Sequence, residues 1–453
     1  MLKEWVNYQR PKEKKPPRPS FWHFFQLGKS LPDRLIGMAR HYGPIVRFPT
    51  PMRVFLISDP SVVHTILVTR QQDFTKDLYP YRQLGKILGH GLLTNVDESW
   101  RERRLNLQQG FKLNLLPTIA RITEECTKIL LNRWRKSEQT GRYLYLEDEM
   151  LQLMMDITCR SLFSETVSVP QLKKRIRWIS SAHRLLMTGR IPWVPTPGNI
   201  RFWYAVSRIR REAERFLQKR RQLAQQPEDF LTVLLSLKDK AGNSLDNKEI
   251  VDEIITFWAT GHETTGAALA WFWFSLNQND SAKQRLREEC EAVFLNHSSL
   301  TPEILNEMPY LKASLEEGLR LYPVVWNFFR KTLQDENIIG YRIPKGSTLV
   351  LCPLSIQRDE RYWPEAEQFK PERFLSGDKP KEHYAYFPFG GGPHVCIGKA
   401  FANVQAQIII AQVMREFDIE FLRKKKTFPY RGLITLRPAQ VMRIRVRKVT
   451  HEI

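Results

Sequence analysis

A glycine-rich segment that ends in a cysteine is the stretch of this sequence with the clearest capacity for chemistry. It reads FPFGGGPHVCIG over residues 387–398, and apolar residues typical of a helix follow it. Glycines allow the backbone to pass close to whatever the sulfur of Cys396 binds. A thiol at the start of a helix is also easier to deprotonate, because the peptide dipoles there favour negative charge. The segment therefore predicts a thiolate that acts as a ligand.

The residues at specific motif positions exclude a phosphate-binding loop and a zinc protease site. A phosphate-binding loop would need Ser or Thr where Ala400 stands, and its glycines would be spaced differently. A zinc protease motif would begin at His262-Glu263, but its second histidine would fall on Gly266. A cysteine that only packs in the core is the alternative for Cys396 taken alone. The many specified neighbours of Cys396 favour a ligand.

A second polar group stands inside a long apolar stretch. Residues 246–276 predict a central helix with Asp246 as its N-cap, because apolar residues lie on nearly every face. Within it, residues 260–265 read TGHETT, and burying an acid and hydroxyl groups is costly unless they serve a purpose. A glycine there lowers helix propensity, and threonine hydroxyls can bond to the preceding turn. We expect a groove that holds O2 and water.

Two pairs of residues at helical spacing can bind or balance charge. Trp100 and Arg104 are four residues apart, so one helix face would present an indole and a guanidinium to a carboxylate. Glu317 and Arg320 are three residues apart on another predicted helix. Taken alone, each pair is also what a solvated helix face carries. Their meaning depends on the rest of the sequence.

Taken in order, these segments resemble the cytochrome P450 family. The cysteine segment is similar to the family pattern F-x-x-G-x-H-x-C-x-G, and residues 260–265 are similar to (A/G)-G-x-(D/E)-T-(T/S), with Thr260 in place of a small apolar residue. Glu317 to Arg320 matches the E-x-x-R motif, and residues 371–374 read PERF. The resemblance covers about residues 20 to 445. Its fold class is mainly α with a small β-rich region in a single domain.

The resemblance implies a haem b cofactor, iron protoporphyrin IX, with Cys396 as the axial ligand of the iron. Two further sets of residues follow from the matching positions. The implied haem-binding residues are Trp100, Arg104, Arg330, His394, Cys396, Gly398 and Phe389. The implied buried network that supports the cysteine segment consists of Glu317, Arg320 and Arg373. For Arg330, an ordinary place in a strand is the alternative.

The same resemblance implies a monooxygenase that uses O2 and two electrons from a separate redox partner to hydroxylate a lipophilic small molecule, such as a fatty acid, terpene or polyketide-like compound. Glu263 and Thr264 would organise proton delivery. The expected substrate pocket comprises Leu88, Phe257, Thr260, Gly261, Val324, Val325, Trp326 and Leu433. Two alternatives are a peroxide-driven or non-oxygenating haem enzyme, and a haem-binding sensor.

Composition suggests the partners and the setting. The net charge is +22, but Lys and Arg are spread over the chain without a recognition motif, so we expect no nucleic acid. An acidic ferredoxin, flavodoxin or flavoprotein reductase fits this charge, with Arg101, Arg103 and residues 423–426 as a proposed basic docking surface. Five scattered cysteines without metal-binding spacing fit a reducing, cytoplasmic setting. We also expect a monomer.

The content of Lys, Arg and Pro at the start of the chain predicts a mobile arm over residues 1–20, followed by a haem domain over residues 21–453. Patterning predicts a hairpin over residues 44–57, helices over 32–40 and 60–69, and a loop over 77–94. Residues 190–199 are apolar but rich in proline. They either pack on the flanking helices or form a lip over the substrate entrance that contacts a membrane surface, aided by a basic helix over 208–221.

Overall fold

The computed structural model describes residues 14–186, 196–238, 242–375, 380–423 and 425–449. Its longer helices are α2 (Leu31–Tyr42), α4 (Tyr79–Leu88), α5 (Asp97–Leu107), α6 (Leu116–Gln139), α7 (Leu146–Phe163), α8 (Val169–Leu186), α9 (Pro197–Arg221), α11 (Asn247–Leu276), α12 (Asp280–Asn296), α13 (Pro309–Leu321) and α15 (Lys399–Glu416). Shorter ones are α1 (Phe21–Gln26), α3 (Pro60–His64), α10 (Phe230–Ser236) and α14 (Pro353–Ile356). The fold is mainly helical, as the sequence predicts.

The strands form small sheets. They are β1 (Ile45–Arg47), β2 (Val54–Ile57), β3 (Phe74–Thr75), β4 (Leu144–Tyr145), β5 (Phe328–Thr332), β6 (Glu336–Ile338), β7 (Tyr341–Ile343), β8 (Thr348–Leu351), β9 (Phe417–Phe421), β10 (Tyr430–Gly432), β11 (Leu436–Pro438) and β12 (Arg443–Lys448). The largest sheet has the order β1-β2-β8-β5-β3, and a second has the order β4-β12-β9. The predicted hairpin is confirmed as the antiparallel pair β1 and β2.

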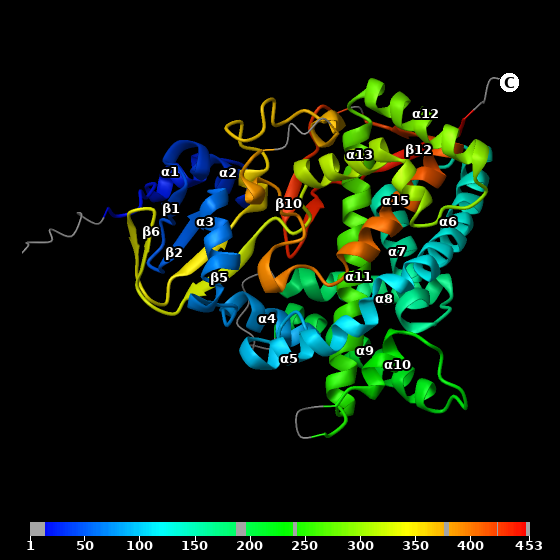
Figure 1. Cartoon of the computed structure of the whole chain (residues 1–453), viewed down its shortest axis with the longest axis horizontal. Coiled ribbons are helices and arrows are strands. Elements are labelled where there is room, and N and C mark those ends of the chain that lie inside the picture. Colours follow the sequence, from blue (N-terminus) through cyan, green and yellow to red (C-terminus); the bar gives the residue numbers. More distant parts are fainter. Residues whose placement is uncertain (1–13, 187–195, 239–241, 376–379, 424, 450–453) are drawn as a thin grey trace, which may run out of the picture.

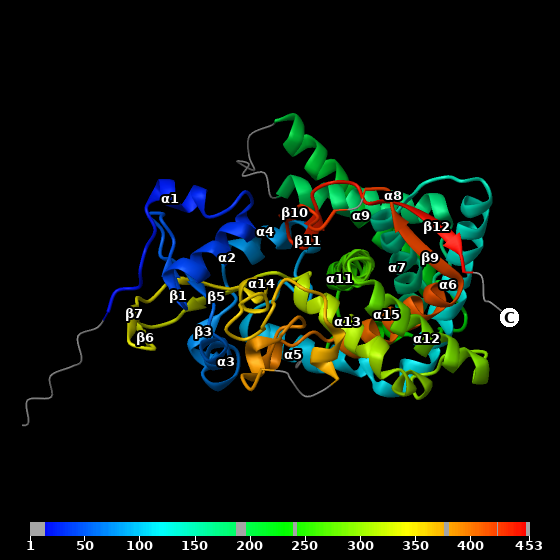
Figure 2. The ribbon, with the colours of Figure 1, turned by 90° about the horizontal axis from the view of Figure 1, so that it is seen from above.

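Helix α11 is the centre of the helical part. Figure 1 shows it running through the height of the molecule, and Figure 2 shows it nearly end on, with other helices around it. It begins with a capping box between Asp246 and Glu249, as the N-cap prediction requires. Between Ile250 and Leu276 nearly every residue is buried, and the helix packs on α7, α9 and α13. Because α11 is central, side chains spaced one turn apart on a single face of it can point into the same internal space.

The largest sheet lies at the other end of the molecule from α6 and α12 (Figure 1). Strand β2 pairs in parallel with β8, so residues near the start of the chain lie beside residues about 300 positions later. The described part of the predicted arm lies against this region: the N–H of Lys14 donates to the Gly340 carbonyl at 3.1 Å, and the N–H of Arg47 donates to the Pro17 carbonyl at 2.9 Å.

Strands β10 and β11 form a hairpin beside α11 that three hydrogen bonds hold in place. The N–H of Leu436 donates to the Val324 carbonyl at 2.8 Å. The indole of Trp326 donates to the Leu433 carbonyl at 3.0 Å, and that of Trp271 donates to the Leu436 carbonyl at 2.8 Å. The hairpin is therefore fixed both to α11 and to the segment that follows α13.

The prediction of a loop over residues 77–94 is wrong, because helix α4 occupies Tyr79–Leu88. Pro80 stands in the first turn, where its missing N–H costs nothing. Leu84, Ile87 and Leu88 then recur at three- and four-residue spacing and are buried on one face. Gly89 ends the helix with a φ of +68°, a conformation that favours glycine.

The expected lip at Ile191, Trp193 and Val194 lies outside the described residues. The predicted basic helix over 208–221 is present as the second half of α9. Across the ranges that the structure describes, the helices lack the combination of length and apolar composition that crossing a membrane requires.

Candidate active site

The cysteine segment is folded tightly over the chain near α3. Gly390 and Gly392 have φ angles of +73° and +62°. A Cβ atom on Gly392 would lie 1.8 Å from the Leu67 carbonyl oxygen, so this close approach requires glycine. The N–H of Cys396 donates to the Phe389 carbonyl at 3.0 Å, and α15 begins at Lys399. The segment thus presents the sulfur at the start of a helix, as predicted.

Cys396 differs from the other cysteines in its surroundings. All five cysteines are within the described residues, and only the side chain of Cys396 is exposed. Protein atoms still surround the sulfur closely enough that burial raises the pKa of the Cys396 thiol, although the Gly398 N–H, Arg104 and Lys399 act to lower it. The start of the helix therefore does not by itself give a thiolate. Coordination to a metal would deprotonate the thiol outright.

Basic and aromatic side chains gather beside the cysteine segment. The Trp100 and His394 rings have their centroids 3.6 Å apart. Burial lowers the pKa of both Arg104 and Arg330. Burial also lowers the pKa of Lys76 to about 7, with repulsion from both arginines and an opposing attraction from Asp97. The sequence predicts four of these groups and misses Lys76.

This cluster fits the two propionates of a haem. The Nδ1 atom of His394 is buried without a hydrogen-bond partner, and burial together with repulsion from Lys76, Arg330 and Arg104 lowers the pKa of His394. Mutually repelling buried cations are stabilised by an anion that they share. An indole N–H, an imidazole, two guanidinium groups and an ammonium suit carboxylates as donors. The donor set therefore agrees with the predicted cofactor.

Nothing in the local sequence distinguishes Lys76 from a surface lysine. It follows the two-residue strand β3, and its ammonium lies 5.3 Å from the centre of the Trp100 ring and 3.4 Å from the Leu93 carbonyl oxygen. Its burial depends on the contact of β3 with β5, which is more than 250 residues away in the chain. Only the tertiary structure places Lys76 with Trp100 and Arg330.

One face of α11 remains accessible. From Ile250 to Leu276, the residues that are not fully buried are Thr260, Gly261, Thr264 and Ala268. Their spacing of three and four puts them on a single stripe. The Thr264 hydroxyl donates to the Thr260 carbonyl and the Thr260 hydroxyl donates to the Thr256 carbonyl, both at 2.8 Å. These are the hydroxyl bonds to the preceding turn that the sequence suggests, and the helix stays continuous from Asn247 to Leu276.

Gly261 also has a packing role. A Cβ atom at this position would lie 2.9 Å from the Thr158 side chain of α7. The glycine therefore allows α7 and α11 to approach closely, besides the role in the substrate groove that the sequence suggests. A larger residue here would require the Thr158 side chain or one of the two helices to shift.

Glu263 does not face this stripe. Its carboxylate lies 2.6 Å from the Nδ1 atom of His183 on α8. It accepts hydrogen bonds from the Thr435 hydroxyl at 2.9 Å and from Arg437 at 3.1 Å. Burial opposes the charge, but His183, Arg437 and His262 together hold the pKa of Glu263 well below its usual range. Glu263 and Thr264 are thus neighbours in sequence that point to different sides of α11.

The residues expected to line the substrate pocket fall into two groups. Leu88 and Phe257 belong to one buried cluster between α4 and the first half of α11. The Phe257 ring packs on Phe230, with centroids 4.4 Å apart. Val324, Trp326 and Leu433 meet at the β10–β11 hairpin. Trp326 is almost fully buried and anchors the hairpin, whereas Val325 is partly exposed.

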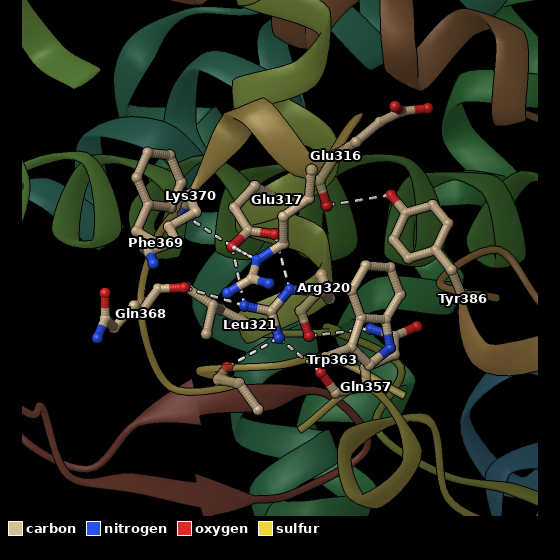
Figure 3. Close-up of polar contacts among 12 residues, drawn as sticks. Glu316, Glu317, Arg320, Leu321, Gln357, Trp363, Gln368, Phe369, Lys370 and Tyr386 are labelled. Atoms are coloured by element: carbon tan, nitrogen blue, oxygen red, sulfur yellow. Dashed lines mark hydrogen bonds and ion pairs between the residues drawn. The ribbon is translucent and has the colours of Figure 1, made fainter. Parts of the chain in front are cut away.

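The predicted charge network is present behind the cysteine segment (Figure 3). Glu317 and Arg320 form a bidentate pair at 2.7 and 2.8 Å, and both side chains are fully buried. Arg373 lies 3.4 Å from Glu317. Arg320 also donates to the carbonyls of Gln357, Ala366 and Gln368. Both charges are therefore compensated inside the core.

Gln357 joins this network to the cysteine segment and was not predicted. Its amide NH2 donates to the carbonyls of Leu319 and Arg320, both at 3.0 Å. Its amide oxygen accepts the N–H of Phe387, the first residue of the cysteine segment, at 3.1 Å. Each hydrogen bond spans at least 30 residues of sequence, so no local pattern reveals this role.

The proposed basic docking surface is not continuous. Arg101 is exposed, but the Arg103 side chain is only 11% exposed and pairs with Glu249 at 2.6 Å. Arg103 therefore faces α11. Residues 423–426 follow β9, and residue 424 lies outside the described residues. Figure 2 shows β9 and β12 well apart from α5. Within the described residues, Lys399 is an exposed cation next to the cysteine segment.

Comparison with known proteins agrees with this geometry. A model of the family described as "Cytochrome P450" matches residues 11–442. The chain is 28% identical to cytochrome P450 4V2 of Mus musculus over 446 residues, which cover 90% of this chain and 83% of that protein. It is also 28% identical to cyclooctat-9-en-7-ol 5-monooxygenase of Streptomyces melanosporofaciens, covering 80% and 79% of the two chains. With its cysteine segment, buried Glu–Arg pair and central helix in one domain, the chain belongs to the cytochrome P450 family.

Proposed function

We propose that the substrate of this haem-thiolate monooxygenase is a lipophilic small molecule, of the kind of a fatty acid, terpene or polyketide. The observation that carries the proposal is the accessible stripe of α11 in a helix that is otherwise buried. Leu84, Ile87 and Leu88 of α4 share a cluster with Ile254 and Phe257 of the same helix. Apolar walls with few polar groups favour apolar ligands.

Bound haem b supplies the iron at which O2 is reduced, and a thiolate ligand donates electron density that favours O–O cleavage. The chain provides the surroundings for this chemistry. Cys396 would hold the iron, and Trp100, Arg104, Arg330 and His394 would hold the propionates, with Phe389 and Gly398 shaping the cysteine segment. Thr264 would hold O2 or water with its hydroxyl, and Glu263 would pass protons from solvent to that side.

The substrate proposal predicts a spectral response. Apolar acids, terpenes and macrolactones from a ligand library should displace water near the iron and shift the haem spin state, whereas sugars and nucleotides should not. Val325→Trp adds bulk at a partly exposed position after α13 and should weaken binding of the largest ligands. Val441→Trp, at a position that is 62% exposed, is the matched control. A response confined to polar ligands would contradict the proposal.

We further propose that electrons come from an acidic ferredoxin, flavodoxin or flavoprotein reductase that docks near Lys399 and Arg101. Surface charges steer such encounters, and salt screens them. Reduction by an acidic ferredoxin should slow as ionic strength rises, and Lys399→Met should flatten that dependence. Arg447→Met, at an exposed position of β12, should not alter it. Reduction rates independent of salt in the unmodified protein would refute this docking site.

The proposed setting is a reducing cytoplasm, where a monomer contacts a membrane surface through the first turns of α9. Ile200, Trp203 and Tyr204 are 61%, 45% and 61% exposed there, next to the expected lip. Apolar side chains beside cations suit the interface of an anionic bilayer. Flotation with vesicles containing anionic lipid tests this contact, and recovery of all protein in the vesicle-free fraction would exclude it.

A further inference from the structure

Two segments that are far from α11 in the sequence, helix α8 and the β10–β11 hairpin, meet at Glu263. His183 comes from α8, Thr435 from the tip of the β10–β11 hairpin and Arg437 from β11. The side chains of His183, Glu263 and Arg437 are 7%, 6% and 13% exposed. A single arginine would balance the charge of one buried carboxylate, so the further contacts from His183 and Thr435 exceed what charge balance requires.

The Arg437 side chain is held in place at both ends of its guanidinium group. Its Nε atom donates to Glu147 at the start of α7, while its Nη1 atom donates to Glu263. The strand that carries it is fixed by the indoles of Trp326 and Trp271 and by the Val324 carbonyl. The guanidinium therefore bridges α7 and α11 from a hairpin that is itself anchored.

Among the residues that the structure describes, Glu253, a second buried acid of α11, has no arginine as close as Arg437 is to Glu263, and its pKa differs accordingly. Glu253 is fully buried like Glu263, but its nearest arginine nitrogen, in Arg103, lies 3.9 Å away. Burial raises the pKa of Glu253 to about 7, although the Leu92 N–H and Arg103 oppose the shift. On the same helix, Glu263 differs from Glu253 in having two close partners, His183 at 2.6 Å and the guanidinium of Arg437 at 3.1 Å.

We propose that Arg437 and Thr435 are positioning residues, which hold the Glu263 carboxylate on the hairpin side of α11 and so determine how it passes protons toward Thr264. The inference rests on the proton-delivery role proposed for Glu263. It adds that the C-terminal hairpin, which also carries the expected substrate residue Leu433, fixes the direction of that acid. No step is added to the reaction, since Glu263 gives a proton to the Thr264 side and regains one from solvent.

The first measurement uses turnover of the haem-loaded enzyme. Arg437→Gln should lower kcat about 10-fold, which is a part of the roughly 10²–10⁴-fold that a placed acid or base contributes. KM should change little, and more O2 should end as peroxide instead of product. Arg437→Lys keeps the charge and should restore much of kcat. Arg431→Gln is the matched control, because Arg431 is the exposed cross-strand neighbour of Arg437.

The second measurement is thermal stability against pH, with and without haem. In the parent protein the pKa of Glu263 is depressed, so its stabilisation is complete above the unfolded value of about 4.3. In Arg437→Gln, burial should raise the pKa of Glu263 above that value against the remaining attraction of His183 and His262. Stability is then lost as pH rises through the new pKa. The Tm deficit of the variant should therefore grow between pH 5 and pH 7.

Other ionisable groups lie near the site, namely His183 on α8, His262 on α11, and Glu147 and Asp148 on α7. The double variant with Glu263→Gln and Arg437→Gln separates them, because its Tm deficit should not depend on pH. A deficit that still grows with pH would assign the effect to these groups and overturn the inference.

The inference and the proposed function fail in different ways. If Glu263→Gln forms product from O2 as efficiently as the parent protein, the proton-delivery role of Glu263 is wrong. The positioning role is wrong if Glu263→Gln releases peroxide in place of product while Arg437→Gln keeps the normal kcat and a Tm deficit that does not change with pH. The positioning role is also contradicted if Arg437→Gln loses kcat, Arg437→Lys does not recover it, and the Tm deficit does not change with pH.

Discussion

Cys396→Ser is expected to abolish O2-dependent product formation and the thiolate-type spectrum of the reduced carbon monoxide complex. A serine oxygen is smaller and harder than a thiolate and donates less electron density to iron. The segment itself should fold, because its shape comes from Gly390, Gly392 and backbone hydrogen bonds. Haem should still be retained in part through the cluster of Trp100 and Arg104.

The reduced carbon monoxide spectrum of purified protein is the direct measurement. Cys290→Ala is a suitable control, since Cys290 is buried on α12 and has no part in the site. It should lose some stability but keep the thiolate-type spectrum. A thiolate-type spectrum in Cys396→Ser would overturn the assignment of the axial ligand.

Removal of either partner of the Glu317–Arg320 pair should give protein without bound haem. Both side chains are fully buried, so Arg320→Ala leaves the Glu317 carboxylate with only the more distant Arg373, at a cost of about 3–5 kcal/mol. It also frees the carbonyls of Gln357 and Ala366. Arg320→Lys should rescue little, because a lysine cannot reproduce the bidentate fork.

Haem content per chain and denaturant unfolding measure this effect. Arg121→Ala is the matched control, since Arg121 pairs with Glu125 on α6 with a side chain that is 64% exposed. Such a pair contributes roughly 0.3–0.5 kcal/mol. Full haem occupancy in Glu317→Ala or Arg320→Ala would show that the cysteine segment does not depend on this network.

Local patterns in the sequence predict those parts of the fold that short-range contacts determine. The capping box at Asp246 and the β1–β2 hairpin are of this kind, and so is the Glu317–Arg320 pair, whose members are three residues apart. The interaction of Arg437 with Glu263 spans 174 residues, and nothing near either residue indicates the other. Gln357 and Lys76 were missed for the same reason.

Two errors come from ambiguity in the patterns themselves. The segment over residues 77–94 contains glycines and a proline that suggest a loop, yet Pro80 and Gly89 stand at the ends of helix α4. Arg103 was assigned to a solvent surface because it stands among charged residues. In the structure its long side chain turns toward α11, where it pairs with the partly exposed Glu249 and lies 3.9 Å from the buried Glu253.

The contact between Gly392 and the Leu67 carbonyl has a consequence for the order of folding. The cysteine segment closes over a turn that lies more than 300 residues earlier, and β2 pairs in parallel with β8 across a similar separation. Contacts of this range form slowly, because the chain must close large loops before they stabilise it. We therefore expect the sulfur to reach its final position late, after the β2 and β8 segments have paired. We expect haem capture to follow this assembly and to be most sensitive to temperature at that stage.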